Sequence, residues 1–158
     1  MPTPFVLRNA TLSDLDQVRE LFREYQSWLG VDLCFQSFEA ELAGLPGRYA
    51  PPSGRLIVAE TDGRLAGAIG LRAIDGEGVC EMKRLYVRDW AKGQGIGRAL
   101  MDRVLAEARE AGYRLMRLDT LPSQMPAANA MYDRAGFREI PAYYDNPVAN
   151  VRFLELAL

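Results

Sequence analysis

Histidine is absent from this sequence of 158 residues. Its absence excludes catalytic schemes in which an imidazole activates a serine or cysteine, and metal sites built on histidine ligands. The two cysteines, Cys34 and Cys80, lie far apart and match no paired metal-ligand spacing, so we expect no metal site and no disulfide framework. We expect both thiols to be buried and reduced. Catalysis would then depend on carboxylates, tyrosines, water or the backbone.

Long apolar runs and a charge excess are also missing. No stretch approaches the roughly 20 apolar residues of a membrane span, and residues 1–30 show no signal-peptide pattern. The 19 basic and 21 acidic residues give a formal net charge of -2, which is too balanced for a nucleic-acid or polybasic membrane surface. We therefore expect a cytoplasmic protein with a single domain over residues 1–158, and neither a nucleic-acid nor a membrane partner.

The spacing of apolar residues predicts strands that alternate with helices. Ser13 and Asp16 are spaced like a weak capping box for the first helix, and Asp62-Gly63 is a typical two-residue hairpin turn. Gly30, Gly112 and Gly136 are expected to end helices. Strands are expected at 5–9, 56–60, 65–71, 79–87, 114–119, 137–140 and 151–156, and helices at 13–29, 35–45, 96–108 and 125–135.

The segment Lys92 to Arg98, KGQGIGR, places three alternate glycines between an expected strand and an expected helix. Glycines let several backbone N–H groups face one anion, and the helix adds the positive end of its dipole. The even spacing does not fit the dinucleotide fingerprint, and no Lys-Ser or Lys-Thr follows as in a P-loop. A phosphorylated cofactor is thus predicted, with a plain strand-to-helix turn whose charges face solvent as the alternative.

The order of expected elements, with this glycine loop, resembles the GNAT superfamily of acyl-CoA-dependent N-acetyltransferases over about residues 5–157. Lys92 to Gly97 matches the signature Gln/Arg-x-x-G-x-G/A with lysine in first place, and Ala128 to Phe137 is similar to a later motif with asparagine, tyrosine and a terminal Gly-Phe. The resemblance implies an α+β fold with a central, mostly antiparallel sheet of six to seven strands and about four helices. It also implies that strands four and five splay apart, and that the arm of acetyl-CoA inserts between them.

By the same resemblance, the backbone of Leu85 to Val87 pairs with the pantetheine arm, the glycine loop holds the pyrophosphate, and Asn129 contacts the arm. No metal is implied. The cofactor-binding residues carried over are Leu85, Tyr86, Val87, Lys92, Gly93, Gln94, Gly95, Ile96, Gly97, Arg98 and Asn129.

The resemblance implies direct transfer of an acetyl group to a primary amine. Glu81 matches a position at which some members place the carboxylate base, and Tyr132 matches the tyrosine that protonates the departing sulfur. The alternatives are a structural Glu81 that pairs with Lys83 or a neighbouring strand, and a Tyr132 that only packs. Neither cysteine has a histidine to activate it, which disfavours an acyl-enzyme intermediate.

For the acceptor we expect a small metabolite or amino acid, with a peptide amine as the alternative. The resemblance places its pocket near the aromatic residues Trp28, Phe35, Phe38, Tyr143 and Tyr144, with Lys83 or Arg84 meeting a substrate carboxylate; ordinary packing is the alternative. The family's C-terminal strands often take part in dimers, which makes Val151 to Leu156 a candidate homodimer surface. A non-catalytic acyl-CoA sensor or interaction module is the second functional hypothesis, and an NAD oxidoreductase the third.

Overall fold

The computed structural model describes residues 4–74 and 76–158, and all side chains in these ranges except that of Phe35. Seven strands form one sheet in the spatial order β1-β2-β3-β4-β5-β7-β6. The pair β4–β5 is parallel and the others are antiparallel, which confirms the predicted α+β fold. The strands are β1 Val6–Asn9, β2 Arg55–Thr61, β3 Arg64–Ala73, β4 Val79–Val87, β5 Leu115–Thr120, β6 Arg138–Ile140 and β7 Arg152–Ala157.

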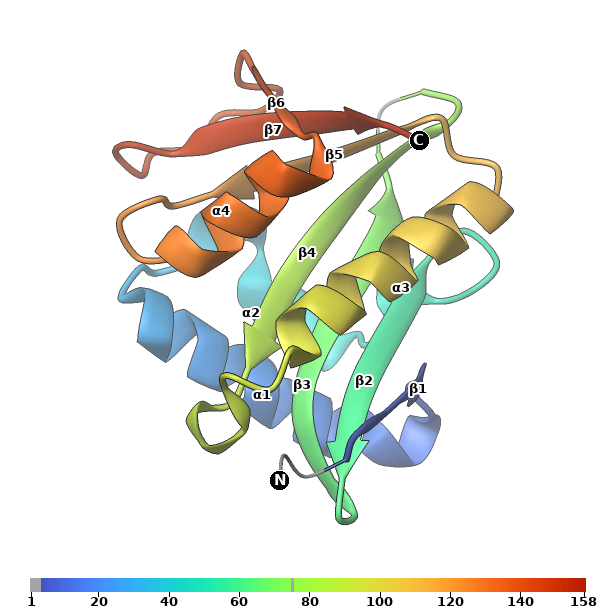
Figure 1. Ribbon diagram of the computed structural model, residues 1–158. Coiled ribbons are helices and arrows are strands. Elements are labelled where there is room, and N and C mark those ends of the chain that lie inside the picture. Colours follow the sequence, from blue (N-terminus) through green and yellow to red (C-terminus); the bar gives the residue numbers. More distant parts are fainter. Residues whose placement is uncertain (1–3, 75) are drawn as a thin grey trace.

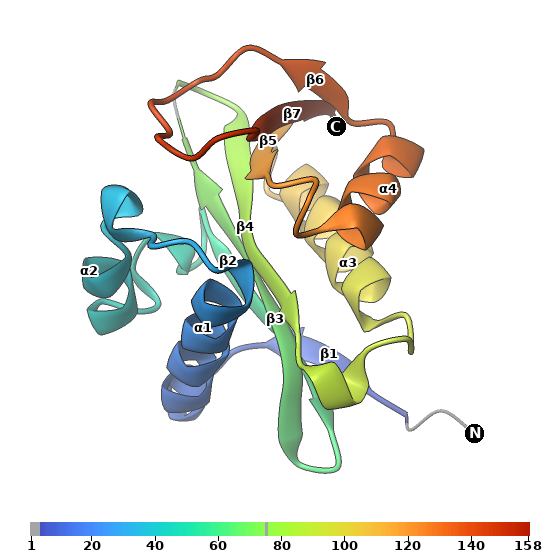
Figure 2. The ribbon, with the colours of Figure 1, turned by 90° about the vertical axis from the view of Figure 1, so that its left-hand side faces the viewer.

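Four helices cover the two faces of this sheet. Helices α1 (Leu15–Leu29) and α2 (Phe38–Ala43) lie on one face, and α3 (Ile96–Glu110) and α4 (Pro126–Ala135) lie on the other (Figures 1 and 2). Strand side chains point alternately to the two faces. The sheet therefore has a core on each side: in β2, Leu56 and Val58 pack with α1, whereas Ile57 and Ala59 pack with α3.

Local turn chemistry accounts for most of the element ends. Asp62 and Gly63 have φ of 50° and 75°, which confirms the predicted hairpin turn. The predicted capping box was wrong by two residues, because the backbone N–H of Thr11 donates to Asp14 Oδ2 at 2.7 Å. The predicted helix 35–45 is interrupted by Ser37, whose φ of 57° separates a 3-10 turn at Cys34–Gln36 from α2.

Strand β4 carries a bulge that opens the sheet. In its ladder with β3, Gly70 faces Lys83 and Ala68 faces Tyr86, so Arg84 and Leu85 together face one residue. Strand β4 pairs with β5 only from Val79 to Glu81. Beyond that point the two strands separate, as predicted for strands four and five, and β4 keeps an unpaired edge on that side.

The bulge is held by a buried ion pair. Arg84 has φ of 61°, which is unfavourable for a residue with a Cβ. Its guanidinium donates from Nε and Nη2 to the two carboxylate oxygens of Glu41 on α2, each at 3.0 Å. Burial alone would raise the pKa of Glu41, but the Arg84 guanidinium overrides it and holds that pKa below its usual value. Helix α2 is thereby fixed to the bulge of β4.

The candidate homodimer strand lies inside the sheet. Strand β7 pairs with β5 along one edge and with β6 along the other. A dimer through the edge of β7 would therefore require β6 to move. The homodimer stays a prediction. Among the residues that the structure describes, no helix is long and apolar enough to cross a membrane.

We expect Arg84→Ala to lower the free energy of unfolding by about 3–5 kcal/mol, because it leaves the buried Glu41 without its partner. Urea denaturation at pH 7 measures this. The difference from wild type should shrink below about pH 4, since the lowered pKa of Glu41 stabilises the fold only while that carboxylate is charged.

The matched control for this variant is Arg23→Ala. Arg23 also pairs with α2, through Glu39, but the two side chains are 56% and 73% exposed. Exposed pairs contribute little to stability, because water and salt screen them. Equal losses in the two variants would contradict the role of burial.

The two cysteines differ in their exposure, which corrects the expectation that both are buried. Cys34 is exposed, whereas Cys80 is buried in the core and donates its thiol to Leu115 O at 3.4 Å. Burial raises the pKa of Cys80 to about 12, so its thiol stays protonated at pH 8. We expect a disulfide reagent to titrate one thiol in the native protein and two in urea. Cys34→Ser should abolish the native reaction, and a rapid reaction in that variant would show that Cys80 is accessible.

Candidate functional site

The segment of residues 92–98, here called the glycine cradle, joins β4 to α3. A 3-10 turn at Asp89–Ala91 precedes it, and Gly93 and Gly95 have φ of 80° and 81°, which glycine adopts without strain. Within the part of the chain that the structure describes, none of the N–H groups of residues 93–98 donates to a backbone carbonyl. These N–H groups and the N-terminus of α3 make a site suited to an anion.

The cradle has a cation at each end, and each cation pairs with an exposed acid. Lys92 Nζ lies 2.8 Å from Asp89 Oδ1 and 4.9 Å from the centroid of the Trp28 ring. Arg98 Nε lies 3.2 Å from Asp102 Oδ2, and both of these side chains are more than half exposed. Such surface pairs contribute little and exchange readily. Both cations are therefore free to turn to a stronger anion.

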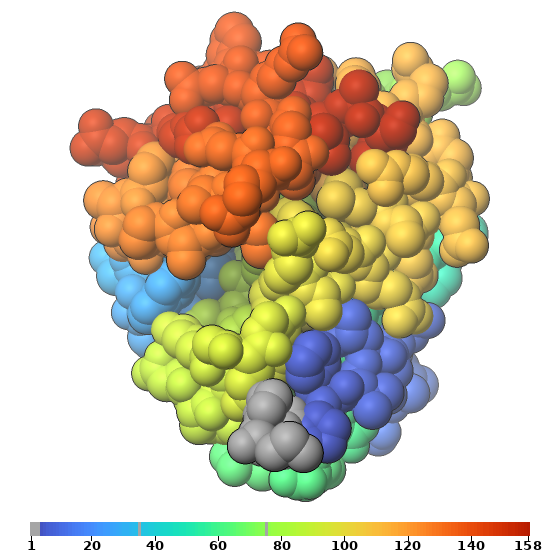
Figure 3. All heavy atoms as spheres, in the orientation of Figure 1, coloured from blue at the N-terminus to red at the C-terminus, as the bar shows by residue number. Residues whose placement is uncertain are grey.

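A groove of about 450 Å³, the cradle groove, runs from the cradle along the free edge of β4. Figure 3 shows the surface hollowed between the orange atoms of α4 and the yellow-green atoms that follow β4. Every residue predicted to bind the cofactor lines this groove except Gln94 and Asn129. Its apolar wall includes residues of α4. Trp28 also lines this groove, and its place in an acceptor pocket stays a prediction.

The two exceptions differ in their surroundings. Asn129 is buried and satisfied within the protein: it donates to Thr120 Oγ1 at 3.0 Å and to Met125 O at 2.9 Å, and it accepts from Arg152 at 3.0 Å. Gln94 has a buried side-chain oxygen with no hydrogen-bond partner among the described residues. Asn129 therefore fixes the turn before α4, and its contact with a cofactor stays a prediction.

The gap between β4 and β5 holds a narrow cavity of about 40 Å³, the strand-gap cavity, with Leu85, Asp119 and Tyr132 among its lining residues. Tyr132, on α4, is 4% exposed and its ring packs edge-on against Phe137 at 5.7 Å. Burial raises the pKa of Tyr132 well above its ordinary value. The phenol is therefore protonated at neutral pH and can act as a proton donor.

A second cavity of about 310 Å³, the tyrosine pocket, opens on the α2 side of the gap. Gln36 and Lys83 line both cavities, so the strand-gap cavity and the tyrosine pocket lie on the two sides of these side chains. Of the predicted pocket aromatics, Phe38 is 1% exposed in the core, and the side chain of Phe35 lies outside the described residues. The pocket is lined by Gln36, Arg48, Arg72, Ile74, Glu81, Lys83, Tyr143 and Tyr144.

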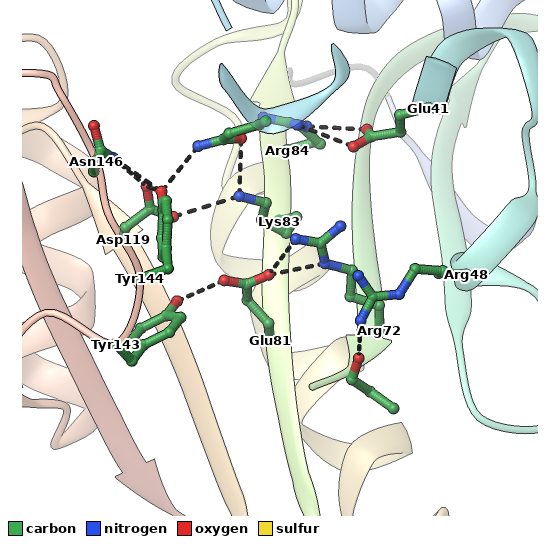
Figure 4. Close-up of polar contacts among 12 residues, drawn as sticks. Glu41, Arg48, Arg72, Glu81, Lys83, Arg84, Asp119, Tyr143, Tyr144 and Asn146 are labelled. Atoms are coloured by element: carbon green, nitrogen blue, oxygen red, sulfur yellow. Dashed lines mark hydrogen bonds and ion pairs between the residues drawn. The ribbon is translucent and has the colours of Figure 1, made fainter. Parts of the chain in front are cut away.

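Glu81 lies in the wall of the tyrosine pocket with both carboxylate oxygens engaged (Figure 4). Arg72, its partner across the β3–β4 ladder, donates to Oε1 at 2.9 Å, and the hydroxyl of Tyr143 donates to Oε2 at 2.6 Å. Glu81 is 2% exposed. The alternative of a structural Glu81 therefore involves Arg72 on the neighbouring strand β3 rather than Lys83. This pairing leaves Glu81 in the wall of the pocket.

Asp119, on β5, provides a second carboxylate on the other side of the gap. Asp119 lies 3.6 Å from Lys83 Nζ and accepts a hydrogen bond from the hydroxyl of Tyr144 at 2.6 Å. Lys83 also donates to Gln36 Oε1 at 3.0 Å. Burial lowers the pKa of Lys83, although the negative charge of Asp119 opposes this effect. Burial and Asp119 raise the pKa of Tyr144.

Several pocket residues could not be found from the sequence. Arg72 and Asp119 lie on predicted strands, and the register that pairs them with Glu81 and Lys83 follows only from the folded sheet. Arg48 comes from a 3-10 turn at Gly47–Tyr49 that has no motif. Arg84 was expected to meet a substrate carboxylate, but Glu41 occupies its guanidinium, so that prediction was wrong.

Among residues 4–74 and 76–158, no cluster of three or more Cys, Asp or Glu side chains is arranged to hold a metal ion.

Related sequences match most of this chain. The chain is 38% identical over 146 residues to an uncharacterized N-acetyltransferase of Schizosaccharomyces pombe, covering 92% of this chain and 89% of that protein. It is 36% identical over 140 residues to an IAA acetyltransferase of Azospirillum brasilense, covering 88% and 87%. It is also 31% identical over 107 residues to an N-acetylaspartate synthetase of Rattus norvegicus, covering 67% of this chain and 36% of the synthetase.

Solved structures have the same fold. A GNAT-family acetyltransferase of Staphylococcus aureus superposes with a TM-score of 0.80 at 21% identity, covering 98% of this chain and 99% of that one. A putative acetyltransferase of Salmonella typhimurium, solved with acetyl-CoA, superposes with a TM-score of 0.71 at 22% identity, covering 98% and 94%. The profile of the acetyltransferase (GNAT) family matches residues 15–137. The chain therefore belongs to the GNAT family of acetyltransferases.

Proposed function

We propose that this protein transfers the acetyl group of acetyl-CoA directly to the primary amine of a small metabolite or amino acid. One observation carries the proposal: the cradle groove follows the free edge of β4 toward the gap, and the strand-gap cavity and the tyrosine pocket share Gln36 and Lys83 in their walls. A donor and an acceptor that enter from opposite sides can therefore meet. The synthetase relative, whose name specifies an acetylated amino acid, favours an amino-acid acceptor.

The cofactor would be held by groups that the fold leaves without partners. The free N–H groups of the glycine cradle, with Lys92 and Arg98, suit a pyrophosphate. The unpaired edge at Leu85 to Val87 suits the amide groups of a pantetheine arm, which would add to the sheet as an extra strand. The apolar side of α4 would cover that arm.

The catalytic roles follow from the positions of three groups. Glu81 lies in the wall of the tyrosine pocket, where its carboxylate would accept a proton from the amine, directly or through water, in exchange for the hydrogen bond from Tyr143. Bulge residue Leu85 is released from the β3 ladder, so its N–H would polarise the thioester carbonyl. Tyr132 in the strand-gap cavity would protonate the leaving thiolate. Acetyl-CoA supplies the activated acyl group.

The function is tested by measuring CoA release from acetyl-CoA with a panel of amino acids, small amines and peptides. We expect turnover with small amines. Tight acetyl-CoA binding without acetylation of any amine would instead favour the non-catalytic acyl-CoA sensor. Turnover with peptides alone would exclude the metabolite acceptor.

The role of the cradle in cofactor binding is tested by substituting two glycines that lie at opposite ends of α3. Gly95 and Gly112 have φ of 81° and 91°, and a Cβ at either would meet nothing within 4 Å. Alanine should therefore destabilise both sites similarly, by about 1 kcal/mol. We expect only Gly95→Ala to weaken acetyl-CoA binding in calorimetry, by about tenfold or more, because the αL geometry aims the cradle N–H groups. Equal affinities in the two variants would remove the cradle from the cofactor site.

We expect Glu81→Gln and Tyr132→Phe each to lower kcat at saturating acetyl-CoA by about a hundredfold to ten-thousandfold, the usual range for a general base or acid. Steady-state kinetics measures this, with acetyl-CoA affinity and melting temperature followed in parallel.

Two control variants make the same chemical substitutions at residues outside the candidate site. Glu155→Gln breaks the Arg117–Glu155 pair, another cross-strand pair at 2.9 Å, and Tyr113→Phe removes a phenol that contacts Ser53. Both controls should retain turnover. Normal kcat in Glu81→Gln or Tyr132→Phe would remove that residue from the chemistry.

A further inference from the structure

The tyrosine pocket has more positive than negative residues in its wall. Arg48, Arg72 and Lys83 face one acid, Glu81, and the remaining lining is neutral. A volume of about 310 Å³ is at the low end of small-molecule sites. A charge in this wall is available to a ligand only if it is not already paired within the protein.

Two of the three cations are already paired with an acid. Arg72 donates to Glu81 from Nε and lies 2.8 Å from it at Nη2, and the side chains are 19% and 2% exposed. Lys83 pairs with Asp119 at 3.6 Å, and its side chain is 4% exposed. Buried pairs of this kind are costly to break, so neither cation is free to bind a substrate anion.

Arg48 is different. Its guanidinium donates to the carbonyl of Ala73, and within the described residues it forms no ion pair. Figure 4 shows it reaching toward Arg72 and Glu81 from the segment between α2 and β2. A guanidinium has five N–H donors in a fork that matches a carboxylate. Arg48 is thus the cation of the pocket wall that keeps donors for a ligand.

The backbone that carries Arg48 is firmly placed. The next residue, Tyr49, is 2% exposed and packs edge-on against Phe22 at 6.5 Å. Its ring fills the space over Gly70, where an added Cβ would lie 2.6 Å from the ring. A buried anchor beside Arg48 limits where its guanidinium can reach. Arg48 itself is exposed, and its anchored backbone and its hydrogen bond to the carbonyl of Ala73 keep its guanidinium at the pocket wall.

We propose that Arg48 binds a carboxylate of the acceptor, so that the acceptor class is a small amine that also carries a carboxylate, as an amino acid does. The inference rests on the proposed acetyl transfer. The amine would lie beside Glu81 and the carboxylate beside Arg48, both of which line the tyrosine pocket. Arg48 is a specificity-determining residue and takes no part in the proton transfers.

The test compares amino acids with analogues that lack only the negative charge. Each amino acid is paired with its carboxamide and with its decarboxylated amine, for example tyrosine with tyrosinamide and tyramine. Acetyl transfer is measured for wild type, Arg48→Gln, Arg48→Lys and the control Arg109→Gln, which changes an exposed arginine at the far end of α3.

We expect wild type to prefer the amino acids. Arg48→Gln should raise their KM by about ten- to a hundredfold, the usual effect of losing a charge-assisted hydrogen bond. Its KM for the carboxamides and for acetyl-CoA should not change. Arg48→Lys should restore part of the preference, and Arg109→Gln should behave as wild type.

The outcomes separate this inference from the proposed function. Turnover of the neutral analogues as efficiently as the amino acids, or an equal effect of Arg48→Gln on both classes, overturns the role of Arg48 and leaves acetyl transfer standing. Acetylation of peptides alone also overturns the role of Arg48 and leaves acetyl transfer standing. Absence of transfer to every amine overturns the proposed function, and the inference with it.

Discussion

The bulge of β4 is the constraint on which the cofactor end of the molecule depends. A positive φ at Arg84 costs about 1–3 kcal/mol and persists only if its surroundings hold it. The bidentate pair with Glu41 does so, with the guanidinium 5.0 Å from the centroid of the Phe38 ring. Because the same donors cannot also serve a substrate, the residue that stabilises the bulge is lost to recognition.

Opening the sheet creates a second requirement, since polar groups along the gap must be satisfied. Two adjacent tyrosines of the β6–β7 loop meet it from opposite sides. Tyr143 donates to Glu81 on β4, and Tyr144 donates to Asp119 on β5. Asn146 adds a contact to Asp119 at 3.2 Å. The loop is thus tied to both strands where they separate, and it closes one wall of the tyrosine pocket.

The sequence predicted the parts of this protein that short-range rules determine. Alternate glycines before an amphipathic helix located the cradle, and the Asp62-Gly63 turn and the glycine ends of the helices set most boundaries. The capping box and the second helix failed where two local solutions compete, since Asp14 rather than Asp16 accepts the N–H of Thr11, and Ser37 adopts a left-handed conformation.

Partner choice in the candidate site could not be predicted, because it depends on register and on distant segments. Glu81 was expected to pair with Lys83 or a neighbouring strand, and the ladder selects Arg72. The exposure of Cys34 and the burial of Cys80 follow from the same long-range packing. The resemblance to a family of known fold predicted where the groove lies, but it could not indicate which arginine would lack an ion pair among residues 4–74 and 76–158.

The contrast between residues on strands and residues in irregular segments affects which acceptor the pocket selects. The strands supply groups that are fixed by ladder contacts, and there each charge is matched by another: Arg72 by Glu81, Lys83 by Asp119. Arg48, which pairs with no acid among the described residues, comes from an irregular segment whose backbone is anchored by its neighbour Tyr49. A change at such a position leaves the sheet, the bulge and the cradle intact. Acceptor choice can therefore vary by substitution at the pocket rim, while the geometry that aligns thioester and amine stays with the sheet.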